Sequence, residues 1–302
     1  MPNCFIIGAA KSGTSTLADV LKQHPQVYLP YAKEPNFFAS ELMFVKGLDW
    51  YRDTFYARAK GRAVRIDASP SYLYLSIKTA ERLKAYDRQQ IIKIIAILRD
   101  PAQRAYSMYW QMVRMNREHR PFAEALAVEE ELLRENIDSI NSFASHQYGY
   151  FRGGCYSTLL KPYLDLFPRD QIHLLLHDDL LDAYESTLLQ VYHFLNLEPV
   201  MPKEFIRSNP AALPRSRRLH AFLYRPSGLL HKILKPFTHH LPYEWRYRLK
   251  RIVIRANLKA IKYPPMPVEV ELQLRRRYAG EIHQLEQIMG RDLSHWLAAR
   301  GG

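Results

Sequence analysis

Residues 4–17 read CFIIGAAKSGTSTL, and this stretch sets the fold that we expect. An apolar run from Phe5 to Ile7 ends at Gly8, which predicts a buried strand at residues 4–8 and then a tight turn. A helix is expected over residues 15–23, and its first backbone N–H groups would point at the turn. The residues expected to hold an anion there are Lys11, Ser12, Gly13, Thr14, Ser15 and Thr16. The alternative is an ordinary capped helix start, since Ser and Thr are good N-caps.

The position of the lysine separates this loop from the common nucleotide loop. That motif is G-x-x-x-x-G-K-[ST], with the lysine directly after the second glycine. Here Lys11 comes before Gly13. The loop therefore departs from the ATPase motif at its most specific position.

Apolar runs and helical periodicity alternate along the first two hundred residues, which predicts an α/β fold with a parallel sheet covered on both faces. The expected strands are 4–8, 26–29, 63–67, 91–98 and 172–176. The expected helices are 15–23, 50–55, 77–86, one from about 104 past 110, 122–135, 156–166 and 184–195. No strand is expected after Asn209. We interpret residues 1–302 as one domain, of which 207–302 is a mostly helical, basic extension.

A second polar motif, LRDPAQRAYSMYW at residues 98–110, follows the strand expected at 91–98. Arg99 would then lie at the carboxyl end of a strand, where open α/β sheets bind ligands. Ser107 would lie on the next helix within reach of a group held by Arg99. An arginine and a serine hydroxyl together suit a second phosphate. The alternative is a local ion pair between Arg99 and Asp100, with Ser107 on the helix surface.

Together, KSGTSTL and RDPAQRAYS resemble the two nucleotide-binding signatures of the sulfotransferase family, whose donor is 3′-phosphoadenosine 5′-phosphosulfate (PAPS). The resemblance implies that the first loop holds the 5′-phosphosulfate and that Arg99 and Ser107, eight residues apart, hold the 3′-phosphate. Four further segments are similar to bacterial members related to heparan-type carbohydrate sulfotransferases: KEPNFF at 33–38, ASPSYL at 68–73, FRGGCY at 151–156 and GRDLSHW at 290–296.

The same resemblance implies roles for single residues. Lys11 would contact the bridging oxygen and ease departure of 3′-phosphoadenosine 5′-phosphate (PAP). Glu34 would be the general base that takes the proton of the acceptor hydroxyl. If Glu34 is instead a surface acid before Pro35, the base would be sought near Asp67 and His146. Arg217, in PRSRRL at 214–219, is the nearest match to a further nucleotide-binding loop of the cytosolic enzymes.

One departure concerns the acceptor. Heparan-type enzymes carry a lysine in an E-K-S-P segment, and this chain has Ala68 at that position. A heparan-like polysaccharide acceptor is therefore put in doubt, and carbohydrate, lipid head group and small metabolite all stay open. His146 and Tyr148 are candidates for the acceptor cleft, although loop packing is the more frequent role of such residues.

The positive charge is concentrated near the C-terminus. The net charge is +13, and residues 207–262 hold fourteen Lys or Arg against one acid, Glu244, so the rest of the chain is neutral. Residues 245–262 have the spacing of a basic amphipathic helix. Such a helix could attract the anionic donor or acceptor, rest on an anionic membrane, or simply dock on the core. The local concentration of charge gives no reason to infer nucleic-acid binding.

Further expectations follow from what the composition lacks. No H-E-x-x-H or C-x-x-C grouping occurs, so we expect no metal, and Cys4 and Cys155 read as core residues. Neither a signal-peptide pattern nor a membrane-length apolar run is found, so we expect a cytoplasmic protein. Two rival functions stay open: a nucleotide kinase-like phosphotransferase, and a peripheral protein that binds anionic membranes or polyanions through 207–262.

Overall fold

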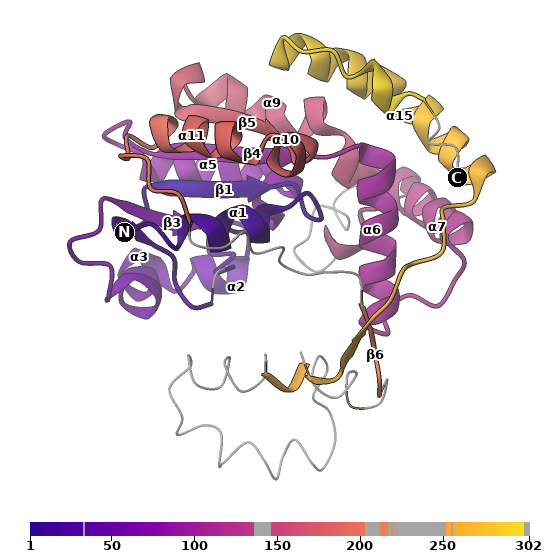
Figure 1. Cartoon of the computed structure of the whole chain (residues 1–302), viewed down its shortest axis with the longest axis horizontal. Coiled ribbons are helices and arrows are strands. Elements are labelled where there is room, and N and C mark those ends of the chain that lie inside the picture. Colours follow the sequence, from indigo (N-terminus) through magenta and orange to yellow (C-terminus); the bar gives the residue numbers. More distant parts are fainter. Residues whose placement is uncertain are drawn as a thin grey trace.

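The computed structural model describes residues 1–32, 34–135, 146–202, 212–216, 219, 252–254 and 256–298. Its centre is a parallel sheet of five strands in the order β2-β3-β1-β4-β5 (Figure 1). The strands are β1 (Cys4–Gly8), β2 (Val27–Tyr28), β3 (Val64–Asp67), β4 (Lys93–Leu98) and β5 (Ile172–Leu176). All four strand pairs are parallel, which confirms the predicted α/β class.

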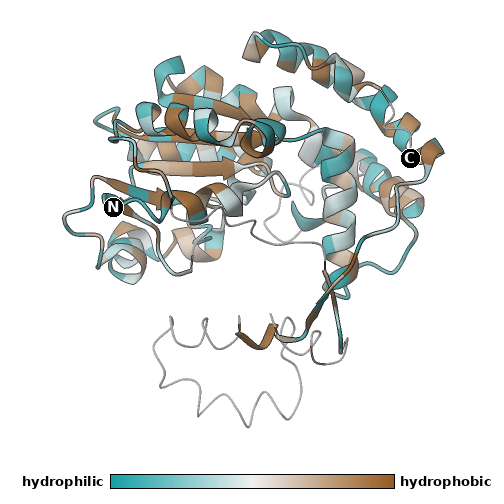
Figure 2. Ribbon diagram, in the orientation of Figure 1, coloured by the Kyte–Doolittle hydropathy of each residue, from teal (hydrophilic) through white to brown (hydrophobic). Residues whose placement is uncertain are grey.

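Both faces of the sheet are buried, as fully apolar strands require. Successive side chains of β1 point to opposite faces: Cys4 and Ile6 pack with α1 (Thr14–Leu21) and α11 (Tyr184–Phe194). Phe5 and Ile7 pack into the larger core on the other face. Figure 2 shows the apolar residues gathered on the strands and on the inner sides of these helices.

The remaining helices surround this core. They are α2 (Glu41–Phe44), α3 (Gly47–Tyr51), α4 (Ser71–Tyr74), α5 (Ser76–Tyr86), α6 (Pro101–Arg114), α7 (Phe122–Glu135), α9 (Tyr156–Leu166), α10 (His177–Asp182) and α15 (Val268–Met289). The predictions for 122–135, 156–166 and 172–176 are confirmed at both ends. The expected helix 50–55 is instead the end of α3 followed by a π-helical turn at Arg52–Tyr56. No described helix has both the length and the apolar character needed to cross a membrane.

Two predictions about the C-terminal region were wrong. A strand does occur after Asn209: β6 (Ala212–Pro214) pairs antiparallel with β7 (Leu258–Ala260). Because β7 lies inside 245–262, the basic helix expected there does not continue to Lys262; residues 245–251 and 255 of that prediction lie outside the described residues. Asn257 explains the change, because its side-chain amide accepts a hydrogen bond from Ser216 N–H and donates one to Ser216 O, 2.9 Å each.

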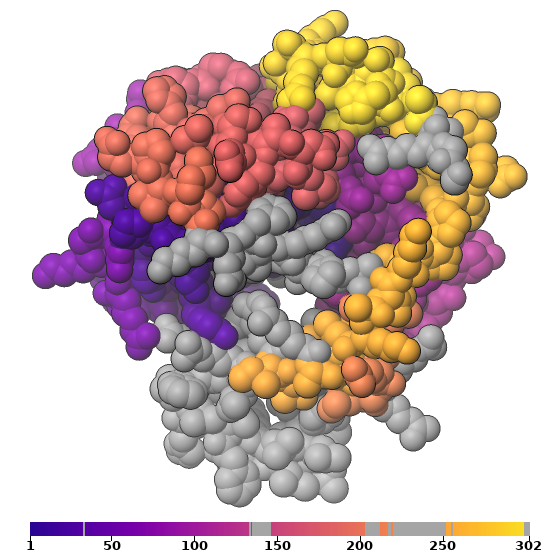
Figure 3. Space-filling model, in the orientation of Figure 1, coloured from indigo at the N-terminus to yellow at the C-terminus, as the bar shows by residue number. Residues whose placement is uncertain are grey.

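Helix α15 joins the described C-terminal segment to the core. It packs against α9 and α6 (Figure 1), and Figure 3 shows its surface in orange and yellow along the upper right of the molecule. The prediction that residues 1–302 form a single domain stays a prediction, since most of 203–251 lies outside the described residues.

Asp100 links α6 to α15. Its Oδ1 accepts hydrogen bonds from Ala102 N (3.0 Å) and Gln103 N (3.2 Å), which caps α6 and explains why the helix starts at Pro101 rather than near Arg104. Its Oδ2 lies 3.1 Å from Arg275 Nη2 on α15, and both side chains are only 2% exposed.

Arg275 also forms hydrogen bonds with two groups besides Asp100. Its guanidinium also contacts Glu271 Oε1 at 2.5 Å and donates to the carbonyl of Trp296. Asp100 thus forms an ion pair with Arg275, which is 175 positions away in the chain. The alternative drawn from the sequence, a local pair with Arg99, did not include this partner.

We expect Arg275→Met to lower the free energy of unfolding by about 3–5 kcal/mol, because two buried carboxylates lose their cation. Urea denaturation measures the loss. The matched control is Arg276→Met, an exposed position on the same helix, which should change stability by no more than about 0.5 kcal/mol. Equal effects of the two variants would contradict this account of the α6–α15 junction.

Candidate functional site

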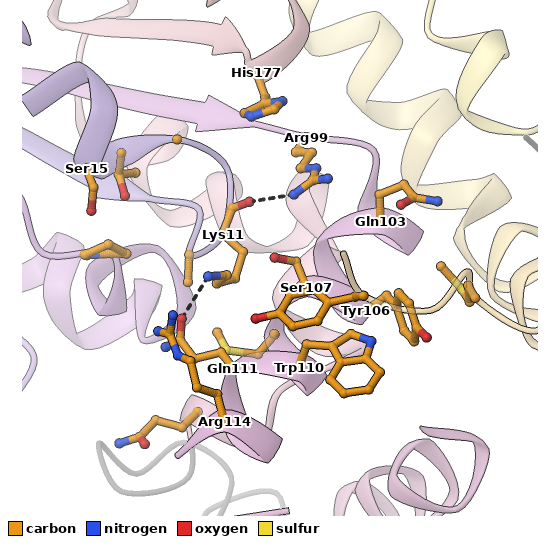
Figure 4. Close-up of a pocket in the computed structure, with 18 of the residues that line it drawn as sticks. Lys11, Ser15, Arg99, Gln103, Tyr106, Ser107, Trp110, Gln111, Arg114 and His177 are labelled. Atoms are coloured by element: carbon orange, nitrogen blue, oxygen red, sulfur yellow. Dashed lines mark hydrogen bonds between the residues drawn. The ribbon is translucent and has the colours of Figure 1, made fainter. Parts of the chain in front are cut away.

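A cleft of about 1400 Å³ opens at the carboxyl ends of β1 and β4. The loop after β1 and the start of α6 form adjacent walls, and Arg99 Nη1 donates to the backbone oxygen of Lys11 at 3.3 Å. Figure 4 shows Lys11 and Arg99 together with side chains of α6 and His177 around this space. The two polar motifs singled out in the sequence therefore meet in one site, as the order of the strands predicts.

The loop after β1 presents a helix N-terminus to the cleft. Gly13, the N-cap of α1, has φ 97°, and a Cβ there would lie 3.2 Å from the His177 ring, so glycine suits both the backbone and the space. The first N–H groups of α1 have no acceptor within the helix, and its dipole favours an anion at this end. The predicted binding residues that line the cleft here are Lys11, Gly13, Thr14, Ser15 and Thr16.

Ser12 behaves differently from its neighbours. Its side chain is fully buried and does not line the cleft, and its N–H donates to Ala9 O at 3.2 Å. The hydroxyl lies on the interior side of the loop, beside the phenol of Tyr156. Direct binding of an anion by this side chain stays a prediction, and Ser12 is the one residue from Lys11 to Thr16 that does not line the cleft.

One face of α6 forms the facing wall. The residues on it recur every three or four positions, which is the spacing of one helix face. They are Gln103, Tyr106, Ser107, Trp110, Gln111 and Arg114. The opposite face, with Ala102, Ala105 and Met112, is buried in the core. The sequence predicted only Ser107 among them as a binding residue. Its helical period, continued past the motif to Arg114, marks the other residues of this face.

Lys11 is the electrostatic centre of the cleft. Its Nζ donates to Gln111 Oε1 at 2.9 Å. Burial, the largest cause, acts together with the positive charges of Arg114 and Arg99 to lower the pKa of Lys11 to about 7, against an opposing effect of Glu34. The charged amine is disfavoured while no anion is near, so an anion that enters the cleft would favour its protonation.

Glu34 lies on the rim of the same cleft, next to Asn36 and Ser71. Asn36 holds this segment through both ends of its side chain: Nδ2 donates to Glu34 O at 2.9 Å, and Oδ1 accepts from Ser71 Oγ at 2.6 Å. The predicted base therefore borders the space that Lys11 also faces. His146 lines the cleft too, whereas Tyr148 does not.

Asp67 is set apart from the cleft. It is fully buried and accepts hydrogen bonds from the hydroxyls of Tyr51 (2.5 Å), Tyr72 (2.7 Å) and Ser69 (2.5 Å). Burial raises the pKa of Asp67 to about 6, although these three hydrogen bonds oppose the shift. Because Asp67 does not line the cleft, it cannot meet an acceptor there directly, and its hydroxyl partners give it a structural role.

An aromatic wall, which the sequence did not reveal, closes one side of the cleft. The rings of Trp110 and Tyr263 stack at 4.8 Å with 5° between their planes. Tyr106 donates its hydroxyl to Pro264 O at 3.1 Å. This segment after β7 is over 150 residues from α6 in the chain, so only the folded structure brings the two together.

Two further expectations concern Arg217 and a metal ion. Arg217 lies outside the described residues. Among the residues that the structure does describe, no group of three His, Cys, Asp or Glu side chains is placed to hold a metal ion.

A parallel α/β sheet with a helix N-terminus, a lysine and an arginine around one cleft is an arrangement that suits an anionic ligand. A family model described as sulfotransferase domain matches residues 1–208, and the chain belongs to the sulfotransferase family. The resemblance drawn from the two sequence motifs is thus confirmed.

Individual relatives agree with this assignment. The mouse protein named heparan sulfate glucosamine 3-O-sulfotransferase 5 is 31% identical over 203 residues, which are 66% of this chain and 54% of that protein. Mouse heparan sulfate glucosamine 3-O-sulfotransferase 3B1 is 30% identical over 201 residues, 67% of this chain and 47% of the relative. The chain thus spans about half the length of these relatives. The crystal structure of a sulfotransferase from Alicyclobacillus acidocaldarius superposes with a TM-score of 0.70 at 26% identity, covering 99% of each chain.

The pKa of Lys11 predicts how stability depends on pH. Because its pKa is about 7 in the folded protein and 10.5 in the reference state, the unfolded chain binds more protons between these values. Lys11 therefore destabilises the ligand-free fold most at pH 7 and below, and this effect fades as pH rises toward 10.5. We expect Lys11→Met to be more stable than wild type at pH 7, by a margin that shrinks steadily up to pH 10.

Urea denaturation at a series of pH values checks this expectation. The matched control is Lys22→Met, at an exposed position just after α1, which should give a margin that varies little with pH. A Lys11→Met margin that stays constant or grows between pH 7 and 10 would show that the amine is charged throughout in the folded protein.

Proposed function

We propose that the protein is a sulfotransferase that moves a sulfuryl group from PAPS to a hydroxyl, or an amine, of an acceptor. The observation that carries the proposal is the meeting of Lys11, the α1 N-terminus, Arg99 and Ser107 in one cleft. This arrangement suits a donor with anionic groups at two ends. Membership of the sulfotransferase family supports the reaction class.

Each end of the donor has its own set of groups in this proposal. The 5′-phosphosulfate lies against the loop from Lys11 to Thr16, where backbone N–H groups and hydroxyls are available. The 3′-phosphate lies against Arg99 and Ser107. The hydrogen bond between Arg99 and the backbone of Lys11 fixes the two sets relative to each other.

The chemical step follows from these positions. The bond between sulfur and the bridging oxygen breaks, and its electron pair stays on the 5′-phosphate oxygen, where protonated Lys11 stabilises the new charge. The acceptor oxygen forms the new bond to sulfur, and its proton passes to the Glu34 carboxylate. The protein contributes position and fixed charges, and PAP leaves as the second product.

The acceptor class covers carbohydrates, lipid head groups and small metabolites. Carbohydrates come first for testing, because the relatives above are named as heparan sulfate sulfotransferases. Ala68, at the position where heparan-type enzymes carry a lysine, is 2% exposed and adds no charge to the cleft.

Thermal shift with nucleotides tests the proposed donor. PAP without Mg²⁺ should raise the melting temperature, and ATP should not. Stabilisation by ATP with Mg²⁺ and none by PAP would favour the kinase-like alternative instead. Once PAP binding is seen, mass spectrometry of extracts incubated with isotopically labelled PAPS would identify acceptors.

Arg99→Ala should lose most of the preference for a 3′-phosphorylated nucleotide. A charge-assisted contact is worth roughly ten- to a hundredfold in affinity. Calorimetric titration with PAP and with adenosine 5′-phosphate measures the preference, and Arg88→Ala, at an exposed position, is the matched control. If Arg99→Ala keeps the wild-type preference, the 3′-phosphate is held elsewhere.

Glu34→Gln should slow transfer by about 10²–10⁴, since the amide keeps the size of the side chain but cannot accept the proton. PAP affinity and melting temperature should stay close to wild type. Glu81→Gln, on the exposed side of α5, controls for the loss of a carboxylate. Turnover of Glu34→Gln within about threefold of wild type would assign the base to another group.

A further inference from the structure

Arg114 is a cation of the cleft to which the donor and base assignments give no role. It is the last residue of α6 and lines the same wall as Ser107 and Gln111. In Figure 4 its side chain extends toward Gln111 and the Lys11 amine. Among the charged neighbours of Lys11, Arg114 has the largest effect in lowering its pKa, which agrees with close approach of the two cations.

The guanidinium has hydrogen-bonding capacity that the described residues do not use. Its Nε is buried and meets no acceptor among them. A buried N–H without an acceptor is costly, and at the wall of a binding cleft a ligand atom can supply the missing acceptor. The cleft lining includes two acids, Glu34 and Glu271. The Glu271 carboxylate forms an ion pair with Arg275, with 2.5 Å between Oε1 and Nη2.

The position along α6 distinguishes between the two ends of the donor. With a rise of 1.5 Å per residue, Arg114 lies roughly 10 Å along the axis from Ser107. It is therefore too far along the wall to share the 3′-phosphate with Ser107. Gln111, which accepts the hydrogen bond from Lys11 Nζ at 2.9 Å, lies between them, so Arg114 belongs to the Lys11 end.

We propose that Arg114 is a catalytic residue that donates hydrogen bonds to the oxygens of the sulfuryl group during its transfer, beside Lys11 at the bridging oxygen. This inference rests on the proposed function. As the bond from sulfur to the leaving oxygen breaks and the bond to the incoming oxygen forms, the three remaining oxygens flatten around sulfur. A planar guanidinium presents parallel N–H groups that match two such oxygens. Lys11 then stabilises the negative charge on the leaving 5′-phosphate oxygen, and Arg114 stabilises the charge on the sulfuryl oxygens.

The affinity ratio of PAPS to PAP tests this role without an acceptor, because the two nucleotides differ only in the sulfuryl group. Arg114→Gln should weaken PAPS by about ten- to a hundredfold and leave PAP within about twofold of wild type. Arg114→Lys should recover part of the loss. Arg134→Gln, whose side chain is 77% exposed on α7, is the matched control and should change neither affinity.

A second readout is the slow hydrolysis of PAPS to PAP and sulfate, in which water replaces the acceptor and its proton again passes to Glu34. Arg114→Gln should slow this step by about 10²–10³, the usual effect of removing one fixed donor. Unchanged affinity ratio and unchanged hydrolysis, with normal PAP binding, would overturn the inference and leave the proposed function standing. Failure of the wild-type protein to bind PAP would overturn both.

Discussion

The carboxylate of Asp100 is the contact on which the geometry of the cleft depends. One oxygen caps α6 and the other meets Arg275 of α15, so a single buried group fixes both where α6 starts and what lies behind it. Each residue of a helix advances about 100° around the axis, so the starting point decides which face meets the cleft. A shift of the sequence by one position along this helix would turn Ser107, Gln111 and Arg114 by about 100°, away from Lys11.

The loop that faces α6 is fixed by strand register. β1 and β4 are adjacent and parallel, with Phe5 opposite Ile94 and Gly8 opposite Ala96. Their carboxyl ends therefore lie at one edge, and the residues that follow them must share it. This arrangement brings the buried Lys11 amine close to the charges of Arg99 and Arg114. Burial first, and then these charges, lower the pKa of Lys11, so the protonated amine costs free energy in the folded protein.

Local sequence predicted the parts of this site that depend on neighbours in the chain. Apolar runs gave the strands, and the two polar motifs after β1 and β4 gave the loop and the Arg99–Ser107 pair. The turn at Asn257 and the strands β6 and β7 escaped prediction, because three-residue strands carry no usable periodicity.

Long-range partners escaped for a different reason. Nothing local marks Arg275 as the partner of Asp100, or Tyr263 as the partner of Trp110. The sequence marks the glycines of FRGGCY, at 151–156, only as part of a family motif. The structure explains one of them: a Cβ on Gly153 would lie 2.8 Å from the guanidinium of Arg104, which is buried and donates to Gly149 O at 3.1 Å.

The two carboxylates that the sequence offered as candidate bases lie in different environments. Asp67 and Glu34 were both candidates for the base. Asp67 is enclosed by three hydroxyl donors, and a hydrogen-bonded path runs from it through Ser69 Oγ to Asn36 N–H (3.0 Å). Asn36 in turn holds Glu34 at the rim.

Asp67 therefore contributes to the site by positioning the segment that carries Glu34. Because its folded pKa of about 6 exceeds the reference value of 3.8, the unfolded chain binds fewer protons between these values, and Asp67 lowers stability as pH rises through that range. The buried Asp67 carboxylate offsets this cost by anchoring the hydrogen bonds that hold Glu34 and Ser71 in place. Of the two candidate bases, Glu34 is the one that lines the cleft, and its role as the base stays a prediction.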